Sequence, residues 1–185
     1  MSDNLQNCSV CGEILTDYGN KELKDGILCR NCVKLASEWL SDEDYKKRTV
    51  KDIKKHLRYR EANLVNLDSF KVSRKTEGKY SLYIDDDNKL FVVSKRKDLK
   101  KDNADVISLD DIVEMSVYEK KYQDKDTVDV YFDIKLNNKE LNEVLFRVNE
   151  FNGLSVDSDE YKQASELAIN YLDELMKNQD FQEEV

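Results

Sequence analysis

Two pairs of cysteines constrain what this chain can fold into more than any other feature. They read Cys8-Ser-Val-Cys11 and Cys29-Arg-Asn-Cys32, are separated by 17 residues, and contain all four cysteines of the 185-residue sequence. This spacing is typical of a zinc site, because each CxxC turn presents two sulfurs to one side of a tetrahedral ion. We therefore predict that structural Zn²⁺ is bound by Cys8, Cys11, Cys29 and Cys32.

Other uses of the four thiols remain as alternatives. Two disulfides are disfavoured because a cytosolic chain keeps its thiols reduced, and a redox-active CxxC normally occurs singly. An iron–sulfur cluster, or no metal at all, is a further alternative. Four cysteine ligands leave no open position on a zinc ion, which argues against catalytic zinc. About 40 residues cannot bury enough surface to be stable alone, so the expected role of the metal is folding.

The residues around the cysteines predict a treble clef or a zinc ribbon over residues 1–45. Gly12 follows the second cysteine, where a turn often needs a positive φ. Asp25-Gly26 predicts a hairpin between Lys21–Lys24 and Ile27–Cys29. Val33–Leu40 has helical spacing. The second cysteine pair then lies at the start of a helix, where backbone N–H groups face the negative charge of the thiolates.

A basic segment follows, and we expect residues 46–70 to form a helical connector. Between residues 46 and 60 there are eight Lys or Arg and one Asp, in a chain whose net charge is −9. Thr49 and Asp52 have the spacing of a capping box, so we predict a helix over residues 49–67. Its expected apolar stripe consists of Val50, Ile53, Leu57, Leu64 and Leu67.

The charges of this helix allow two interpretations. They either contact an anion, such as nucleic acid, an acidic protein or phospholipid, or form a solvated face that balances acidic neighbours. The only histidine, His56, is expected at the surface. The candidate partner-binding residues are Lys51, Lys54, Lys55, Arg58 and Arg60.

From residue 71 the hydrophobic period becomes two, which predicts an antiparallel sheet over residues 71–185. Residues 80–85 and 90–93 read as a hairpin, and residues 106–109 and 112–118 as further strands. The clearest strand is 128–136. Its even-numbered residues are apolar and expected to be buried, and its odd-numbered residues are expected to be exposed to solvent. Residues 144–148 give another strand, and Asp157 or Ser158 caps a C-terminal helix. The expected fold class is α+β.

Composition narrows the functional classes. No apolar run approaches the roughly 18 residues of a membrane span, and Met1-Ser2-Asp3-Asn4 does not read as a signal peptide, so we expect a cytoplasmic protein. The chain has one His and five Gly, and it lacks HExxH, P-loop, GxGxxG and nucleophile-elbow motifs. It also has no proline, which excludes polyproline motifs. We therefore do not expect an enzyme.

Three segments carry a resemblance to a known family: Cys8–Gly12, Leu23–Cys32 and Thr49–Asn63. They resemble an uncharacterised family of bacterial and phage proteins with an N-terminal zinc-ribbon or treble-clef domain and a connecting helix. The order of the later elements, with Ile107–Ile112 before a long strand, is similar to bacterial pleckstrin-homology-like domains.

These resemblances imply a zinc module joined to an interaction platform. The expected function is a non-catalytic, zinc-containing protein-interaction module, such as a phage or bacterial factor that binds and modulates a host protein. The alternative is a nucleic-acid-binding accessory protein that uses residues 46–60.

Overall fold

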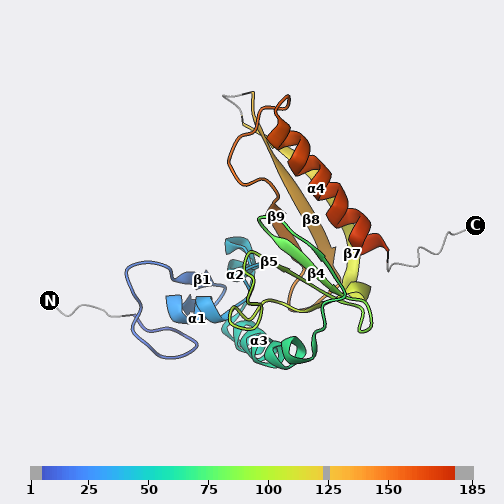
Figure 1. The fold of residues 1–185 in the computed structure, drawn as a ribbon. Coiled ribbons are helices and arrows are strands. Elements are labelled where there is room, and N and C mark those ends of the chain that lie inside the picture. Colours follow the sequence, from blue (N-terminus) through green and yellow to red (C-terminus); the bar gives the residue numbers. More distant parts are fainter. Residues whose placement is uncertain (1–5, 123–125, 178–185) are drawn as a thin grey trace, which may run out of the picture. The chain divides into compact units, whose positions relative to one another are not determined.

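A computed structural model describes residues 6–122 and 126–177 of the chain (Figure 1). Over these residues the fold is α+β, with four α-helices and three antiparallel sheets, as the sequence predicts. The polar N-terminal residues 1–4 lie outside the described part. The chain divides into two compact units, Met1–Val65 and Asn66–Val185. The division into parts at residues 1–45, 46–70 and 71–185 stays a prediction.

The first unit begins with the predicted hairpin. Strands β1 (Lys21–Leu23) and β2 (Gly26–Leu28) pair antiparallel, and Lys24-Asp25 forms the turn, one residue earlier than expected. Gly26 is required here for space rather than for a positive φ, because a Cβ at this position would lie 2.5 Å from the Ser9 hydroxyl oxygen. The hairpin is therefore packed directly against the first cysteine turn.

Two short helices follow the hairpin. Helix α1 (Arg30–Leu35) stops well before the predicted end at Leu40, because Ala36 is extended and the Ser37 N–H donates to the His56 ring instead of continuing the helix. Helix α2 (Asp42–Lys47) was not predicted. It is short and strongly charged, but Ser41 and Asp44 form a complete capping box at its start.

Helix α3 (Val50–Ser69) confirms the long helix and its cap, since the Thr49 N–H donates to Asp52 at 2.9 Å and the Asp52 N–H to the Thr49 hydroxyl at 3.2 Å. Its predicted apolar stripe is partly wrong, because Leu64 is 45% exposed. The buried side chains of α3 follow spacings of three and four and are Ile53, His56, Arg60, Asn63 and Leu67. Ile53 and Leu67 are therefore buried as predicted, and three polar residues share their face of the helix.

The prediction that His56 lies at the surface is also wrong. Its side chain is fully buried, and its Nε2 accepts the Ser37 N–H at 3.1 Å. Arg60 is buried on the same helix face, and its Nε donates to the Leu35 carbonyl at 3.4 Å. Hydrogen bonds to the backbone of a segment that precedes α3 compensate for the burial of these two polar side chains. They can therefore lie on the buried face of the helix, where the sequence pattern predicts only apolar residues.

The second unit starts with a four-stranded sheet in the order β3-β4-β5-β6. The predicted hairpin is confirmed by β4 (Ser81–Asp85) and β5 (Leu90–Ser94). Strand β6 (Ile107–Ser108) is followed by a 3-10 turn, η1 (Leu109–Asp111). Strand β3 (Arg74–Thr76), by contrast, was not predicted.

A three-stranded sheet and a helix complete the second unit. The strands are β7 (Ile112–Lys121), β8 (Val128–Leu136) and β9 (Glu143–Arg147), with β8 in the centre. Helix α4 (Asp159–Met176) begins at the predicted cap, Ser158, and lies along this sheet (Figure 1).

Aromatic rings form the contact between α4 and the sheet. The Tyr171 ring of α4 meets Phe132 and Phe146 edge-on, at centroid distances of 5.7 and 5.6 Å. All three side chains are buried. This core belongs entirely to the second unit.

The even-numbered residues of β8 are buried as predicted, but the odd-numbered residues are not all exposed to solvent. Asp129 and Asp133 are buried as well. Asp129 is stabilised by hydrogen bonds from Tyr122, Asn149 and Gly153. The likeness to pleckstrin-homology-like domains stays a prediction. Within the described ranges, no helix combines the length and the apolar character that crossing a membrane requires.

Candidate metal centre

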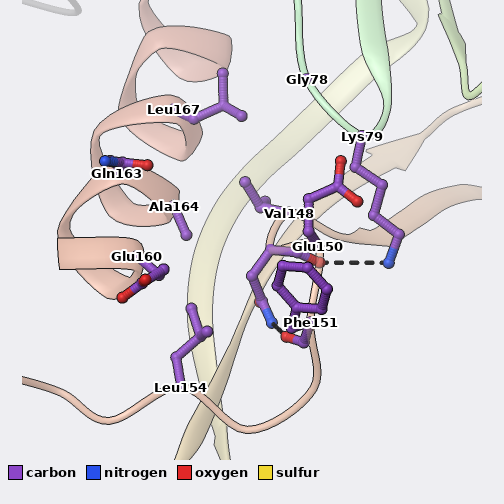
Figure 2. Close-up of a pocket in the computed structure, with 11 residues that line it drawn as sticks. Gly78, Lys79, Val148, Glu150, Phe151, Leu154, Glu160, Gln163, Ala164 and Leu167 are labelled. Carbon is purple, nitrogen blue, oxygen red and sulfur yellow. Dashed lines mark hydrogen bonds between the residues drawn. The ribbon is translucent and has the colours of Figure 1, made fainter. Parts of the chain in front are cut away.

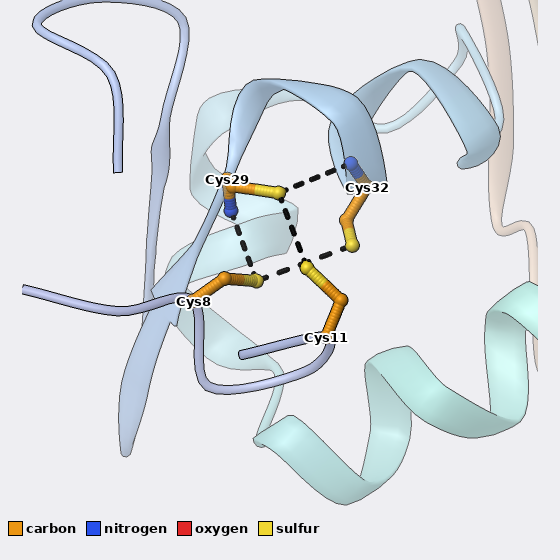
Figure 3. Close-up of side chains that lie close together, drawn as sticks. All are labelled: Cys8, Cys11, Cys29 and Cys32. Carbon is orange, nitrogen blue, oxygen red and sulfur yellow. Dashed lines mark hydrogen bonds between the residues drawn. The ribbon is translucent and has the colours of Figure 1, made fainter. Parts of the chain in front are cut away.

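The four cysteines come together in the first unit, and the elements around them determine their positions (Figure 3). Cys8 and Cys11 lie in the turn before β1. Cys29 is the N-cap of α1, and Cys32 lies in its first turn. The second pair therefore begins a helix, as the sequence predicts.

The sulfur positions fit a tetrahedral metal shell. All four Sγ atoms lie within 4.8 Å of one another. The Sγ atoms of Cys8 and Cys32 are 4.0 Å apart, and those of Cys11 and Cys29 are 3.6 Å apart. A tetrahedral ion with metal–sulfur bonds of about 2.3 Å places its sulfurs about 3.8 Å apart. The cluster could therefore hold a metal ion without rearrangement of the backbone.

Backbone N–H groups point at two of the sulfurs. Cys8 Sγ accepts from Val10 N at 3.5 Å and from Cys29 N at 3.3 Å, and Cys29 Sγ accepts from Cys32 N at 3.5 Å. Burial raises the pKa of the Cys8 thiol, but N–H donors from Cys11, Cys29 and Val10 outweigh it and lower that pKa to about 6. Burial raises the pKa of Cys32, and the neighbouring thiols add to this increase.

The first cysteine turn is closed by its own backbone and attached to the hairpin. Gly12 has the predicted positive φ, +81°, and its N–H donates to the Cys8 carbonyl at 2.9 Å. Ser9 N donates to the Ile27 carbonyl at 2.9 Å, and the Ser9 hydroxyl accepts from Ile27 N at 3.0 Å. These bonds hold Cys8 and Cys11 at a fixed place relative to Cys29.

Sequence reasoning missed two residues that support the site. Ser9 makes the two bonds to the hairpin, and Glu13 accepts from the Asn31 side chain at 3.1 Å while lying 3.9 Å from Cys29 Sγ. Glu13 follows Cys11 by two residues and is the nearest acid to the cysteine turn in sequence. That proximity was the signal that could have found it.

The candidate partner-binding residues separate into two groups on α3. Lys51, Lys54, Lys55 and Arg58 are exposed, and their spacing of three and four places them on one side of the helix. We call these four residues the basic strip. Arg60 is buried and bonded to Leu35, so it is not part of the strip.

The second unit contains a pocket that the sequence did not indicate (Figure 2). Its volume is about 280 Å³. The walls are largely apolar and include Val148, Leu154 and Ala164. Lys79 also lines the pocket and donates to the Asn149 carbonyl at 3.3 Å, and its pKa is lowered by burial and by the nearby Arg147 and Lys95.

The first unit matches a known family model. Residues 6–56 match the model of a domain of unknown function, DUF4428. The match lies inside the first unit and contains all four cysteines. Together with the sulfur cluster it fits an N-terminal zinc-ribbon-like domain. No curated protein and no solved structure matches the chain.

Proposed function

We propose that this chain is a non-catalytic protein-interaction module in which Zn²⁺ holds the first unit folded and the basic strip of α3 binds an acidic partner protein. The observation that carries the proposal is the closed set of four sulfurs, spaced as the ligands of one tetrahedral ion. A closed shell stabilises a fold and leaves no position for a substrate.

The donor set favours zinc or iron over hard cations, and we propose zinc. Four soft thiolates in tetrahedral arrangement suit Zn²⁺ or iron, and hard cations such as Mg²⁺ and Ca²⁺ prefer oxygen ligands. Elemental analysis of the purified native chain should find one zinc per chain and a trace of iron. The double substitution Cys29→Ser/Cys32→Ser should remove the metal. Less than about half an equivalent of zinc in native protein would contradict the assignment.

The basic strip supports a charge-complementary protein partner. Its four cations lie on one helix side in a chain whose net charge is −9, so the local charge differs in sign from that of the whole. Complementary charge speeds association and selects partners. An acidic protein surface would meet attraction at the strip and repulsion elsewhere, which would orient it.

Reversal of the strip tests the protein-partner proposal. The variant Lys51→Glu/Lys54→Glu/Arg58→Glu should lose, in affinity capture from the native host, any stoichiometric partner that the wild type retains. A matched control reverses three exposed lysines elsewhere, Lys34, Lys139 and Lys162. Equal capture by the two variants, or no partner at physiological salt, would refute the proposal.

Nucleic-acid binding by the same strip is the second candidate. Its support is the run of exposed cations along successive turns of α3. Fluorescence anisotropy with labelled single-stranded and duplex DNA and RNA would distinguish the two candidates. The affinity for nucleic acid should fall steeply as the salt concentration rises. In the Lys51→Glu/Lys54→Glu/Arg58→Glu variant, the dependence of log affinity on log salt concentration should be less steep. Absence of binding at low salt would exclude this candidate.

A further inference from the structure

Among the residues that the structure describes, strand β7 leaves one side of its backbone unpaired. It is ten residues long and lies at the edge of the sheet, with β8 on one side. The register pairs Tyr118 with Tyr131, and Glu114 with Lys135. The unpaired edge is the longest in this sheet, since β9 has five residues. Such an edge is a template for another strand.

The ladder shows which β7 residues face the edge. Val148 N donates to the Val130 carbonyl at 2.8 Å, so the even-numbered residues of β8 direct their backbone groups toward β9. The odd-numbered residues of β8 therefore direct their N–H and C=O groups toward β7, and the β7 residues that pair with them are even-numbered. The β7 residues beyond the bulge that have outward N–H and C=O groups are consequently Met115, Val117, Glu119 and Lys121.

The edge is accessible in the described part of the chain. Every residue of β7 is exposed or half-buried, and Val117 is 38% exposed. The Glu119 side chain accepts a hydrogen bond from the Tyr161 hydroxyl of α4, which places the helix over one face of the strand. A bulge between Ile112 and Glu114 interrupts the ladder at one end, and Glu119-Lys120-Lys121 adds charge at the other.

We propose that the β7 edge pairs antiparallel with the β7 edge of a second copy of this chain, about a two-fold axis through Val117, to form a continuous six-stranded sheet. Val117 then faces its own copy, and Met115 faces Glu119 of the second copy. Each of these residues presents outward backbone groups, so the hydrogen bonds of both edges are satisfied.

Charge selects this register. With the axis at Val117, Glu114 lies opposite Lys120 of the second copy, and the symmetry repeats this pair. Both side chains point to the same sheet face, where directly opposite charges attract. Shifting the axis to Ser116 or Tyr118 keeps the backbone pattern but places Glu114 opposite Tyr118 or Tyr122 instead. A partner of other sequence would lack this self-complementarity, which is why a second copy is the favoured occupant.

The test measures the mass of the full metal-loaded chain by sedimentation and native mass spectrometry. Wild type should dimerise as its concentration rises over about 10–300 µM, as expected for a small interface. Glu114→Lys and Lys120→Glu should each weaken the dimer by roughly tenfold or more, because each places like charges opposite one another twice. Mixing the two single variants should restore a heterodimer, and the double variant should restore the homodimer.

Two controls separate pairing from folding. Lys135 lies opposite Glu114 and Asp129 opposite Lys120 on β8, so thermal unfolding of each variant is recorded. Val117→Pro removes an outward N–H and should abolish the dimer while leaving the circular dichroism spectrum unchanged. Reversal of the exposed Lys139 should leave the dimer unchanged.

Three outcomes would overturn the proposal: a monomer at every concentration, a dimer insensitive to the reversals, or a mixture of the single variants that stays monomeric. The proposal would also fail if a strand from another protein displaced the second copy from the β7 edge, because that protein would then be the natural occupant. None of these outcomes depends on the basic strip or its partner, so failure here leaves the proposed function standing.

Discussion

At the scale of single residues, hydrogen bonding explains the positions that hydrophobicity does not. His56 and Asp129 are both fully buried, although neither belongs to an apolar pattern. Each is in contact with backbone N–H groups: His56 accepts from Ser37, and Asp129 accepts from Gly153 at 2.8 Å. A buried polar group is tolerated when a hydrogen-bond partner replaces the water that it loses. Removing one member of such a pair leaves the other buried and without a hydrogen bond.

Replacing His56 tests this directly. His56→Leu puts an apolar side chain of comparable size at this buried position but removes the ring nitrogen that accepts the Ser37 N–H. We expect a loss of about 1–3 kcal/mol in the free energy of unfolding. Chemical denaturation of the metal-loaded chain measures it. Lys54→Leu, an exposed position on the same helix, serves as the control. A loss no greater than that of the control would show that the bond is not stabilising.

Asp129 predicts a pH dependence of the second unit. Burial raises the pKa of its carboxyl, but bonds from Tyr122, Gly153 and Asn149, together with the charge of Arg147, outweigh burial and lower it. A carboxyl with a lowered pKa stabilises the fold above the unfolded pKa of about 3.9. This contribution is lost as the pH falls through the folded pKa.

The variant Asp129→Asn should therefore be less stable than wild type at neutral pH, and the difference should shrink as the pH falls below about 4. Urea unfolding as a function of pH, followed by signals of the second unit, gives the comparison. Asp87→Asn, at an exposed turn position, is the matched control. A difference that stays constant with pH would contradict this role of the carboxylate.

At the scale of elements, local signals explain most helix starts and the strongest strands. Thr49 with Asp52 and Ser158 both cap helices as predicted. Strand β8 matches the predicted 128–136 because its apolar alternation is unbroken. Strand β3 has no such pattern and is held by ion pairs of Arg74 with Asp86 at 2.7 Å and with Glu174 of α4. Those partners are distant in sequence, so no local pattern indicates the strand.

The cap of α4 provides a test at this scale. The Ser158 hydroxyl accepts the Tyr161 N–H at 3.1 Å. Ser158→Ala should lower the free energy of unfolding by about 1 kcal/mol, the usual value of such a cap. Ser155→Ala, an exposed serine three residues earlier, is the control in the same urea titration. Equal stability of the two variants would show that α4 does not depend on its cap.

At the scale of the whole molecule, the two units have different sources of stability. The first unit has a small hairpin, two short helices, most of α3 and the sulfur cluster. The second unit contains a core of its own around Phe132, Phe146 and Tyr171. A metal that binds four thiolates can contribute on the order of 10 kcal/mol to folding, which exceeds what so small a core provides.

Metal removal should therefore unfold one unit and spare the other. In hydrogen exchange with a strong chelator, amides between Cys8 and Lys47 should lose protection, while those of β4, β5 and β8 keep theirs. Excess zinc added afterwards should restore protection, and the same chelator saturated with zinc beforehand is the control. Unchanged protection around the cysteines, or equal loss in β8, would contradict a structural metal confined to the first unit.

Prediction from sequence succeeded where one stretch of chain carries the whole signal. The CxxC spacing, the helix caps and the burial of the even-numbered residues of 128–136 are local, and the structure agrees with each. The first hairpin is also local, although its turn lies one residue earlier than predicted. Prediction failed for the buried face of α3, where a leucine is exposed and a histidine and an arginine are inside. Hydrophobic periodicity treats polar residues as outward, and it contains no information about hydrogen-bond donors and acceptors provided by a distant segment.

The sequence by itself determined the class of fold, the four cysteines that form the cluster and the order of the main elements. Those properties follow from spacing and periodicity along the chain. Only the tertiary structure decided that Ser37 and Leu35 provide partners for His56 and Arg60, and that β7 is an edge strand within residues 6–122 and 126–177. The physical reason is that burial, hydrogen-bond satisfaction and strand pairing depend on groups far apart in sequence, which become neighbours only when the chain folds.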